Sequence, residues 1–499
     1  MYSKGLNHYA YVSGGGPLNV LLQVEGESDQ VLKGDGTPGK IQTGHHELEG
    51  SWLNPTGTKT VRMIARSDER RLVQKFVEIR PLTGNVTNSD VAIMLGTKSE
   101  VGDGFAVSYG FFDAPSDKLL PGSGGTSQFY MHVTDNYSNW MGDLARAYPQ
   151  TKSEPFRKFV LPQAHDAGMF TGPLKVEVIE QVLREPSARQ LVGEKLREMI
   201  GSAYEYIAGV EQFLKYLPPD EVYRALINFA FTQKDDIKTQ LALGVRAFDF
   251  RPGYNWKILS ESEPVGNFEP LNDRMLRHQH GMVPGYGFQH FLYDVVSFLD
   301  SHPGEIVVLD LSFNGFQDGA MRPSDEEVNR MIDHAVSGSS SGLKLGNGDD
   351  YARSYGELIA SKKRLLRDSG PSVSSYNDDD YRTDNPDTII KAIDKLLRNR
   401  SSVRGKSRIV LDLQATFTNK PEGQVQAVRT RTEAGSPLLY TKCRMDTETY
   451  KWLAKPQNLT DRCGDALVLL NNDFIDNALV SLAITNTKQR MGFAGLKPK

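Results

Sequence analysis

From about residue 240 to the end of the chain, short apolar runs alternate with segments whose apolar residues recur at helical spacing. This alternation favours parallel strands whose connecting helices cover the sheet. The predicted strands lie near 158–161, 245–250, 276–280, 305–311, 363–367, 372–376, 408–413 and 466–471. The predicted helices lie near 288–300, 325–335, 353–361, 386–398 and 477–487. Eight strands predict a TIM-like (β/α)8 barrel, in which the Ser/Gly-rich segment Ser337–Asp350 is expected to be a mobile loop.

Two other regions depart from this alternation. Residues 1–138 contain short alternating runs, among them Leu18–Val24, Thr60–Ala65 and Val91–Leu95, between clusters of turn residues. That rhythm predicts an all-β sandwich of about eight strands, a binding module or a spacer, ahead of a barrel domain at 139–499. Residues of about 175–238 are mostly helical in pattern and are inserted after the first barrel strand. They are expected either to pack on the flank of the barrel or to form a lid beside its site.

Composition narrows the classes of partner and compartment. The net charge of −4 argues against nucleic acid and against an electrostatic anchor on anionic lipid. No apolar run reaches the roughly 18 residues that a membrane-spanning helix needs, and the N-terminus lacks the apolar core of a signal peptide. We therefore expect a protein that stays inside the cell, is exported by another route, or has lost a signal. Cys443 and Cys463 leave one disulfide or two free thiols open.

A His-Asp pair follows the first predicted strand. In the stretch LPQAHDAGMF, an apolar run ends at Pro162, and His165 and Asp166 then precede Gly168. Chemistry in parallel α/β folds lies at the carboxyl ends of the strands, where these two side chains are expected. An isolated His-Asp pair is nevertheless more often part of an ordinary surface loop, so two later stretches decide its interpretation.

The first of these stretches is the strand GVRAFDFRP. Alternation places Asp249 and Arg251 on one face of the strand, with Phe248 and Phe250 on the other, which predicts a polar inner face backed by aromatic side chains. The second stretch begins at His280-Gly281, continues with a helical pattern and a Pro-Gly break, and ends with the strand EIVVLDL.

These three stretches, in this order, resemble the catalytic domain of phosphatidylinositol-specific phospholipases C. The resemblance extends over residues 140–476, and its specificity lies in the ordered set, because each motif alone is weak. It implies a lyase that releases diacylglycerol and inositol 1,2-cyclic phosphate from phosphatidylinositol or a related phospholipid at a membrane surface. The enzyme would act there as a peripheral protein.

The resemblance also implies roles for individual residues. His165 and His280 fit a general base and a general acid, because imidazole titrates near neutral pH. Asp473, at the end of the last strand, would orient His165, and Asp249 would do the same near His280. Arg251 offers a planar fork that matches two phosphate oxygens.

Headgroup binding is assigned to other strand ends. The family carries an Asp-x-Tyr that binds the inositol ring, and Asp379 and Tyr381 have that spacing. Ser312 stands where bacterial members have a lysine, so Arg367 is expected to supply the missing positive charge.

No metal or other cofactor is expected. Metal-dependent members have an Asn after the first His and a second carboxylate two residues after the strand acid, whereas this chain has Asp166 and Arg251. That pattern is typical of the metal-independent bacterial enzymes. A metal site shared by His45 and His46 is not expected either, because adjacent residues on a strand point to opposite faces.

Two other functions stay open at this stage. The same barrel could cleave another phosphodiester, such as a glycerophosphodiester or a sphingolipid, although the Glu-x-Asp pair of metal-dependent glycerophosphodiesterases is missing from the second strand. Alternatively, the sandwich could be the working part, as a lectin or membrane adaptor that carries an inactive barrel. The joint presence of His165, Asp249, Arg251, His280 and Asp473 argues against an inactive barrel.

Overall fold

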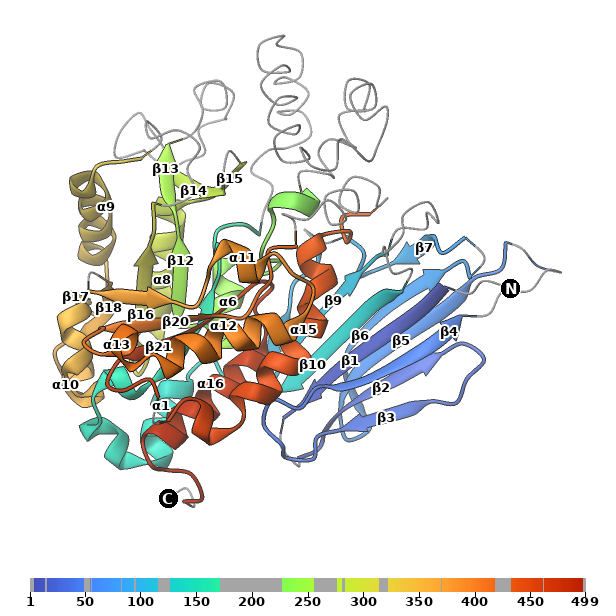
Figure 1. Ribbon diagram of the computed structural model, residues 1–499, viewed down its shortest axis with the longest axis horizontal. Helices are drawn as coiled ribbons and strands as arrows, with labels where there is room; N and C mark the ends of the chain where they lie inside the picture. The colour runs from blue at the N-terminus through green and yellow to red at the C-terminus, as the bar shows by residue number, and fades with distance from the viewer. Residues whose placement is uncertain are drawn as a thin grey trace, which may run out of the picture.

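The N-terminal part of the chain is a sandwich of two five-stranded sheets (Figure 1). The computed structural model describes residues 4–13, 16–48, 54, 56–81, 83–93, 96–114, 126–170, 227–254, 276–280, 283–313, 322–368, 370–417, 432–460 and 462–496. One sheet has the order β4(Gln42–Leu48), β1(Lys4–Val12), β10(Ser127–Thr134), β9(Phe105–Phe112), β8(Glu100–Gly102). The other has the order β3(Gln30–Lys33), β2(Leu18–Val24), β5(Lys59–Ser67), β6(Arg70–Ile79), β7(Val86–Ser89).

The predicted sandwich is therefore present, with ten described strands where about eight were expected. Of the three runs used for the prediction, Val91–Leu95 is not a strand over its described residues 91–93. Side chains from both sheets, such as Val20, Met63, Val107 and Phe129, are fully buried in one apolar cluster. Antiparallel pairing prevails, but β1 pairs in parallel with β10.

The second part of the chain is built on an eight-stranded sheet in which every recorded pairing is parallel. Its order is β17(Lys344–Asn347), β18(Lys363–Arg367), β16(Val307–Leu311), β12(Ala247–Phe250), β11(Val160–Ala164), β21(Leu467–Asn472), β20(Arg408–Asp412), β19(Ser372–Ser374). The curled sheet is consistent with a TIM-like barrel. Among the described residues, however, no pairing joins the edge strands β17 and β19, so the sheet has a seam there.

One predicted barrel strand was wrong. Residues 276–280 form β14(Leu276–His280), which lies between β13(Pro252–Tyr254) and β15(Val283–Gly287) in a separate antiparallel sheet. The eighth strand is β17, inside the segment that was expected to be a loop. Its short sequence, KLGN, gives little of the hydrophobic signal by which a buried strand is recognised.

Five helices lie where the sequence predicts them: α8(Phe288–Ser301), α9(Asp325–Ser337), α10(Tyr355–Ala360), α12(Pro386–Arg398) and α16(Asn477–Arg490). Others were not predicted, namely α1(Trp140–Ala147), α6(Ile237–Leu243), α15(Pro437–Leu453) and the four-residue helices α11(Asp378–Tyr381) and α13(Arg400–Val403). Helix α15 buries polar residues such as Thr441, Lys442 and Asp446 beside apolar ones, so an apolar stripe does not identify it. Most of the predicted helical insertion, residues 171–226, lies outside the described residues.

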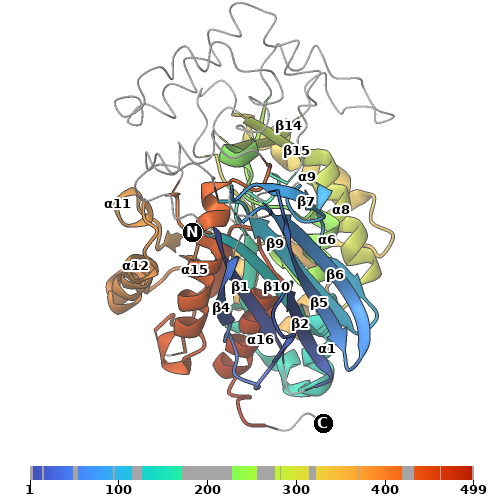
Figure 2. The ribbon, with the colours of Figure 1, turned by 90° about the vertical axis from the view of Figure 1, so that its right-hand side faces the viewer.

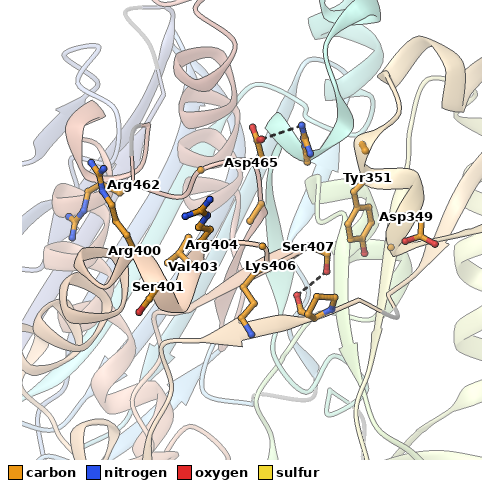
Figure 3. A pocket seen from close by; sticks show the side chains of 17 residues that line it. Asp349, Tyr351, Arg400, Ser401, Val403, Arg404, Lys406, Ser407, Arg462 and Asp465 are labelled. Atoms are coloured by element: carbon orange, nitrogen blue, oxygen red, sulfur yellow. Dashed lines mark hydrogen bonds and ion pairs between the residues drawn. The ribbon is translucent and has the colours of Figure 1, made fainter.

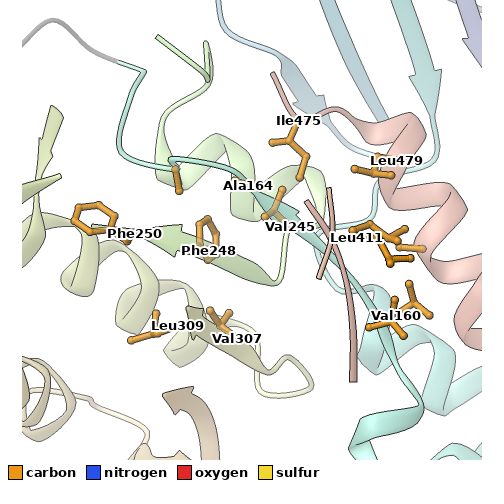
Figure 4. Packing of buried hydrophobic residues seen from close by; sticks show 14 of the residues in the cluster. Val160, Ala164, Val245, Phe248, Phe250, Val307, Leu309, Leu411, Ile475 and Leu479 are labelled. Carbon is orange, nitrogen blue, oxygen red and sulfur yellow. The ribbon is translucent and has the colours of Figure 1, made fainter. Parts of the chain in front are cut away.

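The two faces of the parallel sheet differ toward the carboxyl ends of the strands, where the face away from the helices buries polar side chains. Toward the helices it presents an apolar layer, which Figure 4 shows for Val160, Phe248, Phe250, Leu309 and Leu411. Asp249 and Arg251 alternate with these phenylalanines along and just beyond β12, as predicted. Apolar packing therefore fixes the register of the strand, and a slip of one residue would exchange its polar and apolar faces.

Helices α15 and α16 lie between the parallel sheet and the sandwich (Figures 1 and 2). The Asn477 amide donates to the Ala106 carbonyl at 2.8 Å and to the His132 carbonyl at 3.2 Å, both in the sandwich. Lys442 Nζ donates to Asp446 at 2.6 Å and to Asp476 at 2.7 Å, and the His132 ring lies 3.7 Å from Asp476. A buried polar network therefore joins the two parts, beside apolar packing such as that of the Phe112 ring against Tyr440 of α15.

The described part also shows the character of its helices, its cysteines and its neighbouring histidines. None of its helices is both long enough and apolar enough to cross a bilayer. Cys443 and Cys463 are both free and buried. His46 uses one ring nitrogen toward Glu27 and the other toward His8, and the described residues bring no metal-binding group of ligands together there.

The buried lysine gives a stability prediction. Lys442→Met would leave the carboxylates of Asp446 and Asp476 buried without their cation, which should lower the free energy of unfolding by roughly 3–5 kcal/mol. Lys451→Met on the same helix is the matched control, because that side chain is 68% exposed and its removal should change stability by no more than about 0.5 kcal/mol. Denaturant unfolding measures both, and equal stabilities for the two variants would contradict the assigned role of Lys442.

Candidate active site

Three neighbouring parallel strands and the separate antiparallel sheet bring the predicted catalytic side chains together. His165 and Asp166 follow β11, Asp249 and Arg251 lie in and just after the last residues of β12, Asp473 follows β21, and His280 ends β14. Because β12, β11 and β21 are adjacent and parallel, their carboxyl ends meet at one edge of the sheet. Six residues that are up to 308 positions apart in the sequence thus form one cluster.

His165 is held by Asp473. Its Nδ1 lies 2.7 Å from Asp473 Oδ1, which fixes the ring and leaves Nε2 facing the rest of the cluster. Burial disfavours the charged imidazole, but the carboxylates of Asp166 and Asp473 outweigh this effect and raise the pKa of His165 to about 10. The imidazolium therefore predominates at neutral pH. Burial in turn raises the pKa of Asp473, against the opposing effect of His165.

Asp166 is the residue that the other groups share. It is fully buried, and its backbone is in the left-handed region at φ 43°, which is uncommon for a residue other than glycine. Its Oδ1 lies 2.9 Å from Arg251 Nε and 3.0 Å from His278 Nε2. Its Oδ2 lies 3.5 Å from His165 Nε2 and 3.8 Å from His280 Nε2. Burial opposes the ionisation of Asp166, but the charges of Arg251, His165 and His280 hold its pKa well below the usual range.

Arg251 lies between the carboxylates of Asp166 and Asp249. Its terminal nitrogen donates to Asp249 Oδ2 at 3.1 Å and lies 3.3 Å from His165 Nε2. The side chain is only 17% exposed, and although burial opposes its charge, Asp166 and Asp249 outweigh this and raise the pKa of Arg251 further. Asp249 also accepts the backbone N–H of Asp166 at 3.2 Å and so ties the ends of β11 and β12 together.

Two of these carboxylates, Asp166 and Asp249, form with His165 the group in the described part of the chain that could hold a metal ion. Ligand atoms of His165, Asp166 and Asp249 lie within 4.8 Å of one another. The guanidinium of Arg251 lies among them, and a cation there would meet its positive charge at close range. The donor set suits a metal, but Arg251 competes with it for the same oxygens.

His280 is oriented by a carbonyl group. Its Nδ1 lies 2.8 Å from the Ala230 oxygen, which can only accept, so Nδ1 carries a proton and Nε2 faces Asp166. Asp249 was expected beside this ring. The structure corrects that expectation, because Asp249 contacts Arg251 and the Asp166 N–H, and Asp166 is the carboxylate nearest His280 Nε2.

Sequence reasoning missed His278. Its Nε2 donates to Asp166 while its Nδ1 accepts the backbone N–H of Arg251 at 3.2 Å, an arrangement that requires the neutral ring. Burial lowers the pKa of His278, consistent with this form. A side chain at Gly168 would meet the β-carbon of His278 at 2.5 Å, so close approach explains the glycine in the His-Asp turn. The alternation in RHQH was the available signal, since it places His278 and His280 on one face.

Two further positioning residues were missed, Thr232 and Gln233. The Thr232 hydroxyl donates to the carbonyl of Asp166 at 3.1 Å. The Gln233 amide donates to the carbonyls of His165 at 2.8 Å and Asn472 at 3.0 Å. This segment therefore clamps the turns that carry His165 and Asp473, and no periodic pattern in the sequence marks it.

The predicted headgroup residues are placed differently from the catalytic ones. Tyr381 is 0% exposed, and its hydroxyl contacts the Ser375 hydroxyl at 2.7 Å and donates to the Asp412 carbonyl at 2.9 Å. It supports the end of β19, which corrects the expectation that its ring faces a ligand. Asp379 is exposed in the short helix α11(Asp378–Tyr381), and the exposed aromatic at this strand end is Tyr376, 38% exposed.

Arg367 and Ser312 lie on the other side of the cluster. Arg367 ends β18 and is 4.0 Å from Asp325, with two strands between it and His165 in the sheet order. Ser312 follows β16, and its N–H donates to the Phe250 carbonyl at 3.1 Å. Arg367 therefore ends β18, which lies two strands away from β12, the strand before Arg251. Ser312 follows β16, the strand between them.

No family model matches the chain, and no curated protein matches it. Solved structures with some likeness include a mutant of the phosphatidylinositol-specific phospholipase C from Staphylococcus aureus, at 16% identity and a TM-score of 0.38, covering 70% of this chain and 97% of that one. Another mutant of that enzyme has a TM-score of 0.40 at 16% identity, with 70% and 98% covered. The enzyme from Listeria monocytogenes gives 12% identity and a TM-score of 0.38, with 70% and 98% covered. Values of this size establish no shared activity.

The raised pKa of His165 predicts how a base at this position depends on pH. A base must be unprotonated while the general acid keeps its proton, so the limb of the kcat/KM profile that reports the base should lie toward about pH 10 rather than near neutral pH. Asp473→Asn removes a carboxylate that raises this pKa, so the rising limb should move to lower pH, with a plateau about 10²–10⁴-fold lower because the ring is no longer oriented. Asp333→Asn, an exposed change on α9, is the control. An unmoved limb in the Asp473 variant would contradict the assignment.

Proposed function

We propose that the chain is a phosphodiesterase of the phosphatidylinositol-specific phospholipase C type, which cleaves its lipid to diacylglycerol and inositol 1,2-cyclic phosphate. The observation that supports this most is that two histidine Nε2 atoms, of His165 and His280, approach the same carboxylate oxygen beside a buried guanidinium. Base, cation and acid are the three groups that internal cleavage of a phosphodiester requires. They stand within reach of one phosphate group.

His165 would start the reaction. Its Nε2 takes the proton of the inositol 2-hydroxyl, and the oxygen forms a bond to phosphorus. Asp473 holds Nδ1 and stabilises the imidazolium as it forms. Oδ2 of Asp166 is buried and has no hydrogen bond from the described residues, so a hydroxyl of the bound substrate could donate to it before the transfer.

Arg251 would bind the phosphate. The guanidinium can donate to non-bridging oxygens while Asp166 and Asp249 keep it in place, and charge that builds up on phosphorus is then stabilised by a group that is already oriented. His280 completes the reaction, as its Nε2 gives a proton to the glycerol oxygen while the bond from phosphorus to that oxygen breaks. The Ala230 carbonyl holds the ring through Nδ1.

The substrate would be bound from a membrane surface. Phosphatidylinositol or a related phospholipid supplies the phosphodiester, and the protein would act as a peripheral enzyme. Asp379 and Arg367 stay candidates for headgroup contact at the ends of the neighbouring strands, and exposed Tyr376 replaces Tyr381 as the aromatic candidate. The N-terminal sandwich, residues 1–138, would be the support on which this enzyme domain rests.

Loss of either histidine tests the proposed reaction. His165→Ala and His280→Ala should each lower turnover of phosphatidylinositol in detergent micelles by at least about 10²-fold, as expected for general acid–base groups. His334→Ala, an exposed histidine on α9, should keep wild-type turnover. Circular dichroism shows whether each variant folds. A folded His165 or His280 variant with wild-type turnover would contradict that role.

The position of Arg251 predicts that no divalent metal is needed. Its guanidinium neutralises Asp166 and Asp249, which would otherwise be the ligands of such an ion. Turnover should therefore be the same with and without EDTA. A loss of activity in EDTA that calcium restores would show instead that a metal displaces Arg251.

A further inference from the structure

A groove of about 1080 Å³ lies away from the candidate active site, and nothing in the proposed reaction uses it. It runs along the seam of the parallel sheet, where Ser407 precedes β20, Ala466 precedes β21 and Gly348 follows β17 (Figure 3). The candidate active site is at the opposite end of β21, at Asp473. A strand of this length spans roughly 20 Å, so the two sites are separate.

The charges in the groove are unbalanced. Five cations line it but only two carboxylates, although the whole chain has a net charge of −4. Arg157 is 3.3 Å from Asp465, and Arg462 is 2.9 Å from Asp394 outside the groove. The other three cations have no ion pair with an acidic group in the described part of the chain: Arg400, Arg404 and Lys406.

The three unpaired cations come from a single turn. Arg400 begins the short helix α13(Arg400–Val403), and the N–H of Arg404 donates to the Arg400 carbonyl at 2.9 Å. Residues four apart in a helical turn lie on one face, so both guanidinium groups can reach one ligand. Gly405, at φ 74°, then reverses the chain and brings Lys406 to the same groove.

The opposite wall is already fixed by its own hydrogen bonds. Arg490 donates to the carbonyls of Gly464 at 3.1 Å and Ala466 at 2.8 Å, which hold the loop before β21. Arg462 donates to the Asp394 carbonyl at 2.9 Å. The Ser407 hydroxyl donates to the Pro371 carbonyl at 3.0 Å and joins the floor of the groove to β19. A ligand would therefore need to order only the side chains of α13 and of the turn that follows it, among them exposed Arg400 and Arg404.

We propose that this groove binds a phosphate monoester, with Arg400, Arg404 and Lys406 as its cations. A monoester carries about −1.5 to −2 charges near neutral pH and three acceptor oxygens, which matches three cations that line one groove better than a single carboxylate does. Such a group can belong to a soluble phosphorylated molecule or to the headgroup of phosphatidic acid. The proposal is independent of the reaction assigned to the other end of the sheet.

Titration of the full chain with inorganic phosphate tests this site, followed by calorimetry or phosphorus NMR. The variant Arg400→Gln/Arg404→Gln should weaken phosphate binding at least about tenfold, because two charge-assisted contacts are lost. The matched control is Lys391→Gln/Lys395→Gln, two exposed lysines on α12 with the same change in net charge, and it should bind as the wild type does. Phosphodiesterase activity in micelles should not differ among the three proteins.

Sedimentation with phosphatidylcholine vesicles, with and without phosphatidic acid, identifies the source of the phosphate. Binding to vesicles that depends on both phosphatidic acid and the arginines supports a lipid headgroup, whereas phosphate binding without it supports a soluble ligand. The proposal is overturned if the wild type shows no saturable phosphate binding, or if the arginine variant and the lysine variant bind phosphate equally.

Discussion

A guanidinium buried between two carboxylates is the interaction on which the candidate site depends. Taking Arg251, Asp166 and Asp249 out of water is costly, and this cost is offset only if all three meet at short range. Adjacent parallel strands achieve this, since β11 and β12 end side by side. The left-handed backbone of Asp166 then turns its carboxylate toward Arg251, His165 and His280.

The support of this cluster reaches into the sandwich. The amide of Asn472, one residue before Asp473, donates to Asp446 at 2.8 Å, and Lys442 connects Asp446 with Asp476 beside His132 of β10. A second connection begins at Ser99, whose N–H donates to Asp235 at 2.6 Å, two residues after the clamp at Gln233. The Asp473 side therefore reaches the sandwich through these hydrogen bonds and the 3.7 Å contact between Asp476 and His132, and the His165 side reaches it through the Ser99–Asp235 hydrogen bond. This arrangement favours a supporting role for the sandwich over that of a freely jointed spacer.

The sequence predicted those features of the fold that follow from the periodicity of a strand or helix. The alternation of Phe248, Asp249, Phe250 and Arg251 is a property of the strand itself, and the structure has it as expected. Spacing alone did not give the direction of a side chain, and Tyr381 turned inward because its hydroxyl binds the Asp412 carbonyl. The clamp at Gln233 acts through backbone carbonyls, which any sequence would offer, so no motif identified it. Strand β17 was not predicted because its four residues contain only one large apolar side chain, which gives no recognisable strand pattern.

Phosphorus NMR of the reaction with phosphatidylinositol tests the central claim, that His165 and His280 act on either side of a phosphate held by Arg251. Internal attack is favoured because the nucleophile and phosphorus share one molecule, with effective molarities that can reach about 10⁵–10⁸ M. The first product should therefore be inositol 1,2-cyclic phosphate, and a substrate whose 2-hydroxyl is methylated should not react. Acyclic inositol phosphate from the first turnover, with no cyclic species before it, would contradict this account and would indicate attack by water.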